Sequence, residues 1–534
     1  MQILYNANVY TLDPHNPRLS AIAILQDKII ATGNDYAMLS RYSQSNAKNE
    51  KATCYDLEGL TVLPGLSDAH IHLEKYSLNL NSVDCETETK TECLKRIAQQ
   101  AAKTSPGEWI RGHGWNQNNW KDGFGTGLEL DQVAPFNPVY LTAKSLHAAW
   151  VNSSALHQAQ LSAASSDPVG GRIQRTKDNQ PSGILFESAM QIVEDCIPKP
   201  TLKQITQAIE AALPGLWWMG LTSLHDFDGS DCFSALQILH QENKLNLRVV
   251  KSIPHENLSN AIALGLRSGF GDKTLRIGNV KLFADGALSQ RTAAMLQPYQ
   301  NDPDNRGILL IDEEEFFDIG REALGHGLGL AVHAIGDRAN HEILNGYCRL
   351  YQEFQANFSR FRNRIEHVQL IHPEDAGRLS EMGIIASMQP IHATSDMNMA
   401  NQYWDERSKT AYAWRLLLER GTILAFGSDA PVESPNPFWG LHAAITRQRA
   451  DGSPGPEGWY PAQRIDRYKA IQAYSAAPAF AAGLENDLGK ITPGFLADLI
   501  VLPQDPFTCP PDDLRNIRPL ATMIGGEWLF SEFN

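Results

Sequence analysis

The sequence predicts an α/β protein built around a TIM (β/α)8 barrel, with a small β-sandwich domain and a long insertion. Three observations predict this architecture. From about residue 220 onward, short apolar segments alternate with helical ones, as in parallel βαβ units. Both ends of the 534-residue chain consist of short strand-like segments separated by turn residues. Between the first expected barrel strand and the second lies a long segment with apolar runs of its own.

The two ends of the chain are expected to form one composite domain. The N-terminal strand candidates are QILYNANVYTL, SAIAILQDKIIATG and ATCYDLEGLTVLPG, and the C-terminal ones are GKITPGFLADLIVLP and PLATMIGGEWLF. Strands at both ends of a chain can pair into one sheet and share a core. We therefore expect a β-sandwich from residues 1–60 and 485–534, and a barrel from residues 61–484 with an insertion at about 80–218.

Eight apolar segments are candidates for the barrel strands. The first is LTVLPGL, and the others are GLTSLHDF, LRVVKSI, NVKLFADG, LGLAVHAIGD, RIEHVQLI, GIIASMQPIH and TILAFGSDAP. Helical patterns such as DEEEFFDIGREALGHG and ANHEILNGYCRLYQEF separate several of them. Eight parallel strands, each followed by a helix, are the number that closes a TIM barrel.

The composition of the chain disfavours several classes of function. The formal net charge is −15 and the sequence pI is near 5.5, which disfavours nucleic acid and anionic membrane surfaces as partners. The first residues lack the basic and apolar regions of a signal peptide, and no run of about 18 apolar residues predicts a membrane span. The seven cysteines are scattered without a C-x-x-C pair, which is typical of reduced thiols. We expect a cytoplasmic protein.

The segment LTVLPGL is followed closely by His70 and His72. Side chains at positions i and i+2 of a strand point to the same side, so the two imidazoles would project together from its carboxyl end. Neutral imidazoles are common ligands of divalent metals. Alone, the pair is weak evidence for a metal site, because H-x-H also occurs among ordinary surface and core residues.

Reactive residues of a TIM barrel lie at the carboxyl ends of its strands. Each candidate there also has a structural explanation: a lysine can extend its ammonium to solvent from a strand edge, a histidine can be a core residue, and an aspartate can cap a helix. Their joint occurrence at five strand ends predicts a metal site. The residues are His70, His72, Lys281, His333, His367 and Asp429.

With these residues in this order, the chain resembles the amidohydrolase superfamily and, within it, amidohydrolase family 3, the YtcJ-like metal-dependent hydrolases. The resemblance extends over most of the chain, in order. The stretches that carry it are LPGLSDAHIHL, AAWVNSSAL, PVGGRIQRTKDNQPSGILFESA, KLFADGALSQRTAAM, VHAIGDRAN, FGSDAPVESPNPFWGLHAAITR and ITPGFLADLIVL.

The resemblance implies a binuclear centre of two divalent ions, and Zn²⁺ is the ion it implies because Zn²⁺ suits imidazole ligands. His70 and His72 would hold one Zn²⁺, and His333 and His367 the other. Lys281, carboxylated on its ε-amine, would bridge the two ions, and Asp429 would be a further ligand. An unmodified Lys281 would leave a mononuclear site of His70, His72, His333 and Asp429 as the alternative.

The implied reaction is hydrolysis of a non-peptide C–N bond, an amide or cyclic amide, in a small-molecule substrate. A metal-activated hydroxide would attack, with Asp429 as the general base. His225, in SLHDF, is a candidate donor to the developing oxyanion, with a supporting or core position as the alternative. Candidates for substrate contacts, with structural support as the alternative for each, are His113, Trp115, His147 and Arg291.

Other functions use the same ligands. A mononuclear deaminase of an aminated heterocycle would not need a bridging carbamate from Lys281. An esterase, lactonase or phosphotriesterase would share the metal chemistry. A non-catalytic binding protein on the same scaffold is expected to have lost ligands, whereas all six are present. A homodimer is also expected from the resemblance.

Overall fold

The computed structural model describes residues 1–43, 52–80, 82–117, 120–143, 148–168, 171–289 and 291–532. By its internal contacts the chain divides into two compact units. One comprises residues 1–76 together with 206–534, and the other comprises residues 77–205.

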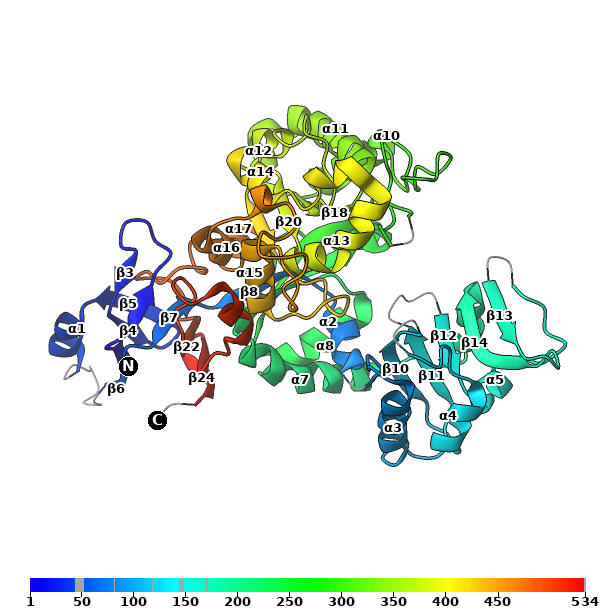
Figure 1. Ribbon diagram of the computed structural model, residues 1–534. Helices are drawn as coiled ribbons and strands as arrows, with labels where there is room; N and C mark the ends of the chain where they lie inside the picture. Colours follow the sequence, from blue (N-terminus) through cyan, green and yellow to red (C-terminus); the bar gives the residue numbers. More distant parts are fainter. Residues whose placement is uncertain are drawn as a thin grey trace. The chain divides into compact units, whose positions relative to one another are not determined.

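The larger unit contains a sheet of eight parallel strands, and this confirms the predicted TIM barrel (Figure 1). Each strand pairs in parallel with the next along the chain. In order, the strands are β8 (Leu66–Ile71), β15 (Leu221–Asp226), β16 (Arg248–Pro254), β17 (Leu275–Phe283), β18 (Leu330–Ala334), β19 (Arg364–His367), β20 (Ile385–Met388) and β21 (Leu424–Phe426).

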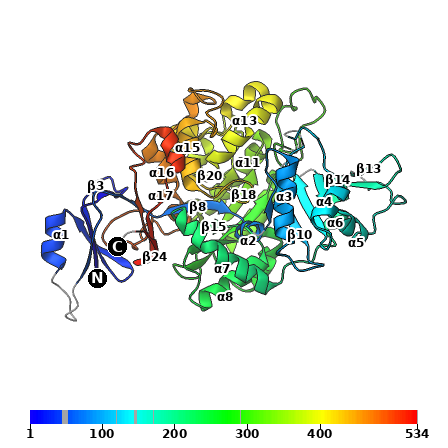
Figure 2. The ribbon, with the colours of Figure 1, turned by 60° about the horizontal axis from the view of Figure 1, so that its bottom comes forward.

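Helices follow the strands and cover the outside of the barrel (Figures 1 and 2). Helix α2 (Leu73–Asn79) follows β8, and α7 (Leu202–Trp218) precedes β15. The others are α8 (Ser230–Gln241), α9 (Leu258–Ala263), α10 (Glu313–Gly325), α11 (Asp337–Phe354), α12 (Arg378–Met382), α13 (Pro390–Trp404), α14 (Trp414–Glu419), α15 (Pro437–Thr446), α16 (Arg467–Ala473) and α17 (Ala476–Ala481).

The first and last strands of the barrel meet through a small number of specific contacts. An isolated parallel bridge joins Ile71 to Ala430. The buried carboxylate of Asp68, on β8, accepts hydrogen bonds from the backbone N–H groups of His70 and Ser428, each at 3.0 Å, and from the Ser428 hydroxyl at 2.5 Å. This carboxylate therefore ties strand one to the segment after strand eight.

The first barrel strand predicted from the sequence begins too early in the chain. Residues Thr61–Pro64 form β7, which pairs with strands from both ends of the chain, and the barrel begins only at Leu66 in β8. Gly65 separates the two strands, and a Cβ there would lie 2.3 Å from Thr222 Oγ1. Both strands are fully buried, and the apolar run LTVLPGL continues from β7 across Gly65 into the first residue of β8, so it shows no boundary between them.

The N- and C-terminal strands lie together in two sheets, with both ends of the chain nearby (Figure 1). The first sheet, in spatial order, is β24 (Glu527–Ser531), β23 (Ala521–Ile524), β22 (Leu499–Leu502), β7, β2 (Asn8–Tyr10) and β3 (Arg18–Leu19). The second is β5 (Lys28–Gly33), β4 (Ala21–Leu25), β1 (Gln2–Tyr5) and β6 (Thr53–Asp56), with α1 (Asp35–Tyr42) beside it. One core joins the two sheets, with Leu4, Ile22 and Ile24 from one and Val9, Val62 and Val501 from the other.

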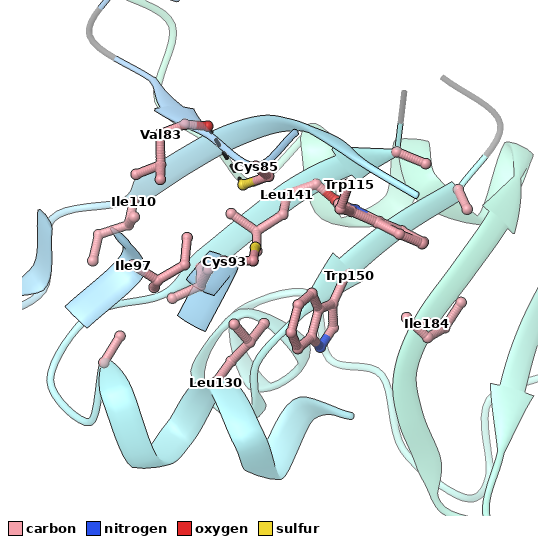
Figure 3. Close-up of a cluster of buried hydrophobic side chains, with 14 of the residues drawn as sticks. Val83, Cys85, Cys93, Ile97, Ile110, Trp115, Leu130, Leu141, Trp150 and Ile184 are labelled. Carbon is pink, nitrogen blue, oxygen red and sulfur yellow. Dashed lines mark hydrogen bonds between the residues drawn. The ribbon is translucent and has the colours of Figure 1, made fainter. Parts of the chain in front are cut away.

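The 77–205 unit has a mixed sheet of its own. In spatial order its strands are β13 (Gly171–Arg175), β14 (Pro181–Glu187), β12 (Ala148–Val151), β11 (Val139–Ala143), β10 (Ile110–Trp115) and β9 (Val83–Asp84). Its helices are α3 (Lys90–Ala101), α4 (Gly127–Val133), α5 (Ser153–Gln158) and α6 (Ser188–Glu194). Trp115 and Trp150 are fully buried in a core with residues of α3 and α4, such as Ile97 and Leu130 (Figure 3).

No helix in the described part of the chain has the length and apolar character needed to cross a membrane. Each of the seven cysteines carries a free thiol. Three of them, Cys85, Cys93 and Cys232, are buried as small apolar side chains.

A buried ion pair joins the barrel to the terminal sheets and gives a first prediction. Arg248, on β16, donates to Asp498 at 2.5 and 2.7 Å, and both side chains are buried. Replacement of Asp498 by Ala leaves the guanidinium buried without its partner, and we expect a loss of about 3–5 kcal/mol of stability. Scanning calorimetry of wild type and variant measures this loss of stability as a lower melting temperature of the variant.

The matched control is Glu419→Ala, which removes the partner of an exposed arginine, Arg415. We expect this variant to lose no more than about 1 kcal/mol. Equal melting temperatures for the two variants would contradict the importance of the buried pair.

Candidate functional site

The six residues predicted as metal ligands converge at the carboxyl end of the barrel. The His367 ring lies 4.8 Å from the His70 ring and 4.6 Å from the His333 ring, centroid to centroid. Asp429 Oδ1 lies 3.5 Å from His70 Nε2 and 3.4 Å from His72 Nε2. Strands that are far apart in the sequence thus bring imidazoles and a carboxylate to one place.

Lys281 reaches the same place from β17. Its Nζ atom lies 4.5 Å from the centroid of the Phe227 ring, and that ring stacks on His70 at 4.2 Å. Nζ is also 5.0 Å from the centroid of the Phe283 ring, which packs against His333 at 5.3 Å. The Lys281 ammonium therefore lies near two aromatic rings, one packed against His70 and the other against His333.

The tandem histidines each have one ring nitrogen occupied by a carboxylate. His70 Nδ1 lies 2.6 Å from Glu366 Oε2, and His72 Nδ1 lies 3.0 Å from Asp228 Oδ1. An ionised carboxylate only accepts hydrogen bonds, so it places the imidazole proton on Nδ1. Both Nε2 atoms then carry free lone pairs, on the side where Asp429 lies.

The other two histidines are oriented by neutral groups. His367 Nδ1 lies 2.8 Å from Gln389 Oε1, which leaves Nε2 as its free nitrogen. His333 has the reverse arrangement, because its Nε2 lies 3.0 Å from the Gly286 carbonyl oxygen and Nδ1 is free. Carbonyl oxygens accept hydrogen bonds, so both contacts fix the tautomer of the ring.

Burial keeps three of the four imidazoles unprotonated. Desolvation lowers the pKa of His70 and of His367 well below the usual value, and lowers the pKa of His333 to about 3. Burial also lowers the pKa of Lys281 to about 8. His70, His333 and His367 are therefore neutral at pH 7, which is the form that binds a cation.

The barrel interior below the site holds a buried guanidinium. Arg364 donates to the His225 ring at Nδ1 (2.8 Å), to the Ala69 carbonyl oxygen (2.6 Å) and to the Ser387 hydroxyl (2.6 Å). It also forms a bidentate pair with Glu366. Burial alone would raise the pKa of Glu366, but the charges of Arg364 and Lys281 lower it below its usual value.

His225, a candidate oxyanion donor, belongs to this interior network. It lies on β15 with its Nδ1 on Arg364, and its side chain is buried. Burial lowers the pKa of His225 to about 3. These contacts favour the alternative expectation, a supporting position in the barrel interior.

Two site residues have a backbone conformation in the left-handed region, with φ of 74° at His367 and 61° at Asp429. A side chain other than glycine in this region costs on the order of 1–3 kcal/mol, and such residues cluster at functional sites. At His367 the turn also breaks the alternation of the strand. Glu366 and His367 are neighbours in sequence, yet both contact His70.

The candidate substrate contacts differ in their surroundings. Trp115 is fully buried in the 77–205 unit and donates to the Leu141 carbonyl oxygen at 2.8 Å, which favours its alternative role, structural support. His113, on β10, pairs with the Thr142 hydroxyl at 2.8 Å. Arg291 is 43% exposed and forms an ion pair with Asp302 at 2.9 Å. His147 lies outside the described residues.

Sequence reasoning missed the groups that orient the ligands: Glu366, Asp228 and Gln389. Glu366 directly precedes His367, and in a regular strand it would point to the opposite side. Asp228 lies two residues beyond the end of β15 and Gln389 one residue beyond β20. The position of Asp228 and Gln389 just after barrel strands could have identified them, because strand ends carry the reactive residues in this fold.

The donor set fits divalent metal ions. One donor atom from each of His70, His367 and Asp429 lies within 4.8 Å of the others. The neutral imidazoles and the carboxylate present lone pairs there, and their remaining ring nitrogens are already bonded to protein groups. Nitrogen and oxygen donors of this kind, oriented by protein groups behind them, are typical of zinc and related ions.

The family model described as "Amidohydrolase family" matches residues 53–530. The chain belongs to the amidohydrolase family. This amidohydrolase is 30% identical over 539 residues to the putative amidohydrolase YtcJ of Bacillus subtilis (strain 168), with 99% of each chain covered. The family resemblance predicted from the sequence motifs is thereby confirmed.

Two further relatives were found. The chain is 26% identical to the N-substituted formamide deformylase of Arthrobacter pascens, over 98% of this chain and 97% of the relative. Among solved structures, an uncharacterized metal-dependent hydrolase from Pyrococcus furiosus superposes with a TM-score of 0.78 at 28% identity. That match covers 95% of this amidohydrolase and 100% of the other chain.

The buried His225 gives a prediction about acid stability. Its pKa is about 3 in the folded amidohydrolase and near 6.5 in an unfolded chain. Because the folded pKa is depressed, the neutral ring's stabilisation is fully present above about pH 6.5. It is lost as the pH falls from 6.5 toward 3, at up to about 1.4 kcal/mol per pH unit.

In the variant His225→Asn we expect the free energy of unfolding to decrease less steeply as the pH falls. The difference in slope corresponds to about one fewer proton taken up on unfolding. Urea unfolding between pH 6.5 and 4 measures the slope for both proteins. His15→Asn, at an exposed position, is the matched control and should leave the slope unchanged. A His225→Asn slope equal to that of wild type would contradict the buried neutral state.

Proposed function

We propose that this amidohydrolase is a metal-dependent hydrolase that cleaves the C–N bond of an amide or cyclic amide in a small molecule. The convergence of four imidazoles, a lysine and an aspartate at the carboxyl end of the barrel carries the proposal. The protein named N-substituted formamide deformylase adds support, since a formamide is an amide.

The four histidines and Asp429 are proposed to hold two divalent ions, most simply Zn²⁺. His70 and His72 would hold one ion through Nε2, since their Nδ1 atoms face carboxylates. His367 through Nε2 and His333 through Nδ1 would hold the other. Asp429 lies beside both tandem histidines and is the further ligand.

Lys281 is proposed to be carboxylated and to bridge the ions. An ammonium between two cations would be repelled, whereas a carbamate offers two anionic oxygens. Carboxylation requires a neutral amine, which burial favours. With a pKa lowered to about 8, roughly a tenth of the Lys281 side chains are neutral at pH 7.

When bound, the ions would supply Lewis acidity, which polarises a carbonyl and lowers the pKa of a water molecule. Asp429 is proposed to move the proton. Its carboxylate would accept a proton from water as the water oxygen bonds to the carbonyl carbon. It would then give that proton to the leaving nitrogen as the C–N bond breaks, so that the products are an acid and an amine.

The bridging role of Lys281 predicts its effect on metal content. Wild type purified without chelators should contain about two divalent ions per chain, and Lys281→Ala about one or none, because the bridge is lost. Elemental analysis of both proteins measures this. Lys273→Ala, which removes a partly exposed lysine just before the same strand, should keep the wild-type content.

One ion per chain in both wild type and Lys281→Ala would argue against the bridge and favour a mononuclear deaminase. If the protein is instead an esterase or lactonase, it will hydrolyse esters and leave amides intact. Wild type without bound metal would overturn the proposed function.

The proton-transfer role of Asp429 predicts a large kinetic effect. Asp429→Asn retains the size of the side chain but removes its basicity, and kcat for an amide substrate should fall by about 10²–10⁴. A panel of N-substituted formamides and cyclic amides identifies the assay substrate. Metal content of the same sample separates loss of the base from loss of the ions.

The control is Asp304→Asn, at an exposed position away from the barrel strands, which should leave kcat unchanged. An Asp429→Asn protein that keeps its metal and retains more than a tenth of wild-type kcat would rule out Asp429 as the base.

A further inference from the structure

A buried network of two aspartates and a lysine lies behind His72. Asp226 ends strand β15, Asp228 follows two residues later, and Lys251 comes from the neighbouring strand β16. All three side chains are almost completely buried, with Asp226 at 0%, Lys251 at 2% and Asp228 at 4% exposure. Charged side chains at such depth are rare unless they are paired and hydrogen-bonded.

Lys251 holds the two aspartates together. Its Nζ lies 3.0 Å from Asp226 Oδ2, and it donates to the backbone carbonyl oxygens of Asp228 and Ser252. Asp226 Oδ2 also accepts a hydrogen bond from the Asp228 backbone N–H at 3.2 Å. The ammonium therefore compensates the charge of Asp226 and fixes the backbone from which the Asp228 side chain extends.

Asp228 uses its two oxygens for different tasks. Oδ1 lies 3.0 Å from His72 Nδ1, while Oδ2 accepts from the backbone N–H groups of Glu74 at 2.7 Å and Lys75 at 3.3 Å. Asp226 Oδ1 accepts from the Leu73 N–H at 2.8 Å. The first N–H groups of helix α2 are thus satisfied by the same carboxylates that stand behind His72.

These contacts argue against a separate metal site at this position. Donor atoms of Asp226, Asp228 and Cys232 lie within 4.8 Å of one another. However, the Lys251 ammonium already occupies Asp226 Oδ2, and backbone N–H groups or His72 occupy the other carboxylate oxygens. The carboxylates therefore have their partners within the protein.

We propose that Asp228 is a positioning residue for His72, and that Lys251, through Asp226 and the backbone of Asp228, keeps the Asp228 carboxylate in place. The carboxylate retains the proton of His72 on Nδ1 and directs the lone pair of Nε2 toward the proposed metal centre. This inference rests on the proposed function, because it assigns to His72 the task of binding a metal.

The same arrangement occurs behind the other histidine of the pair. His70 Nδ1 faces the carboxylate of Glu366, and Glu366 is paired with the buried guanidinium of Arg364. In both cases a carboxylate fixes the imidazole and a buried cation fixes the carboxylate or the residue beside it. The two networks come from different strands, so the tandem histidines are oriented independently.

The test is Zn²⁺ binding by the full chain after removal of metal with a chelator, followed by competition with a chromophoric chelator. Asp228→Asn has nearly the same shape but a neutral amide, which can donate to His72 Nδ1 and shift the ring proton to Nε2. We expect its affinity for one Zn²⁺ to be about 10–100-fold weaker than that of wild type. The matched control, Asp231→Asn, changes an exposed aspartate on the neighbouring helix α8 and should bind as wild type does.

A second measurement separates positioning from general support of the fold. The ¹⁵N resonances of His72, assigned by their absence in His72→Asn, should show the Nδ1–H tautomer in metal-free wild type. They should show an increased Nε2–H population in Asp228→Asn. If Asp228→Asn does not fold, Asp228→Ser replaces it, because the shorter side chain removes the carboxylate from His72 Nδ1.

Weaker Zn²⁺ binding together with the tautomer shift would support the proposal. Unchanged affinity and tautomer in the variant, with metal bound by wild type, would overturn it and leave the proposed function intact. Wild type that binds no Zn²⁺ would overturn both.

Discussion

The site depends on one buried guanidinium in the barrel interior. Arg364 lies on β19 and bonds to groups of three other strands: the Ala69 carbonyl oxygen on β8, His225 on β15 and Ser387 on β20. A planar guanidinium with five N–H donors can satisfy acceptors in several directions at once. Its pairing with Glu366 holds the carboxylate that orients His70, so the orientation of a proposed ligand begins with this cation.

The join between the first and last barrel strands adds a second constraint. A Cβ at Gly427 would lie 2.5 Å from the His70 backbone nitrogen and 2.6 Å from Asp68 Oδ1, so only glycine allows this close approach. Just beyond it, the Asp429 N–H donates to the His70 carbonyl oxygen at 2.6 Å. The proposed base and a proposed ligand therefore share a backbone hydrogen bond, and their separation is fixed by closure of the barrel.

The sequence allowed the barrel and its six strand-end residues to be predicted because both follow from local patterns. Strand–helix alternation indicates the fold, and the fold indicates where reactive residues lie. Contacts between distant segments left no such pattern. Gly65 divides one apolar run between two sheets, and the left-handed turn at His367 lets Glu366 face His70 against strand alternation. Trp115 stands in a glycine-rich motif that resembles a pocket rim but is buried in a core.

The protein itself arranges the donor atoms of the site. Each histidine of the cluster has one nitrogen bonded to a carboxylate, an amide or a carbonyl oxygen, and burial holds His70, His333 and His367 in the neutral form. This arrangement has a cost in desolvation and in backbone strain at His367 and Asp429. The free energy of folding already includes these costs. A cation that binds to the folded protein therefore does not have to reorganise its ligands. A preorganised site of this kind gains affinity and fixed geometry at the expense of stability, which is a common compromise in enzymes.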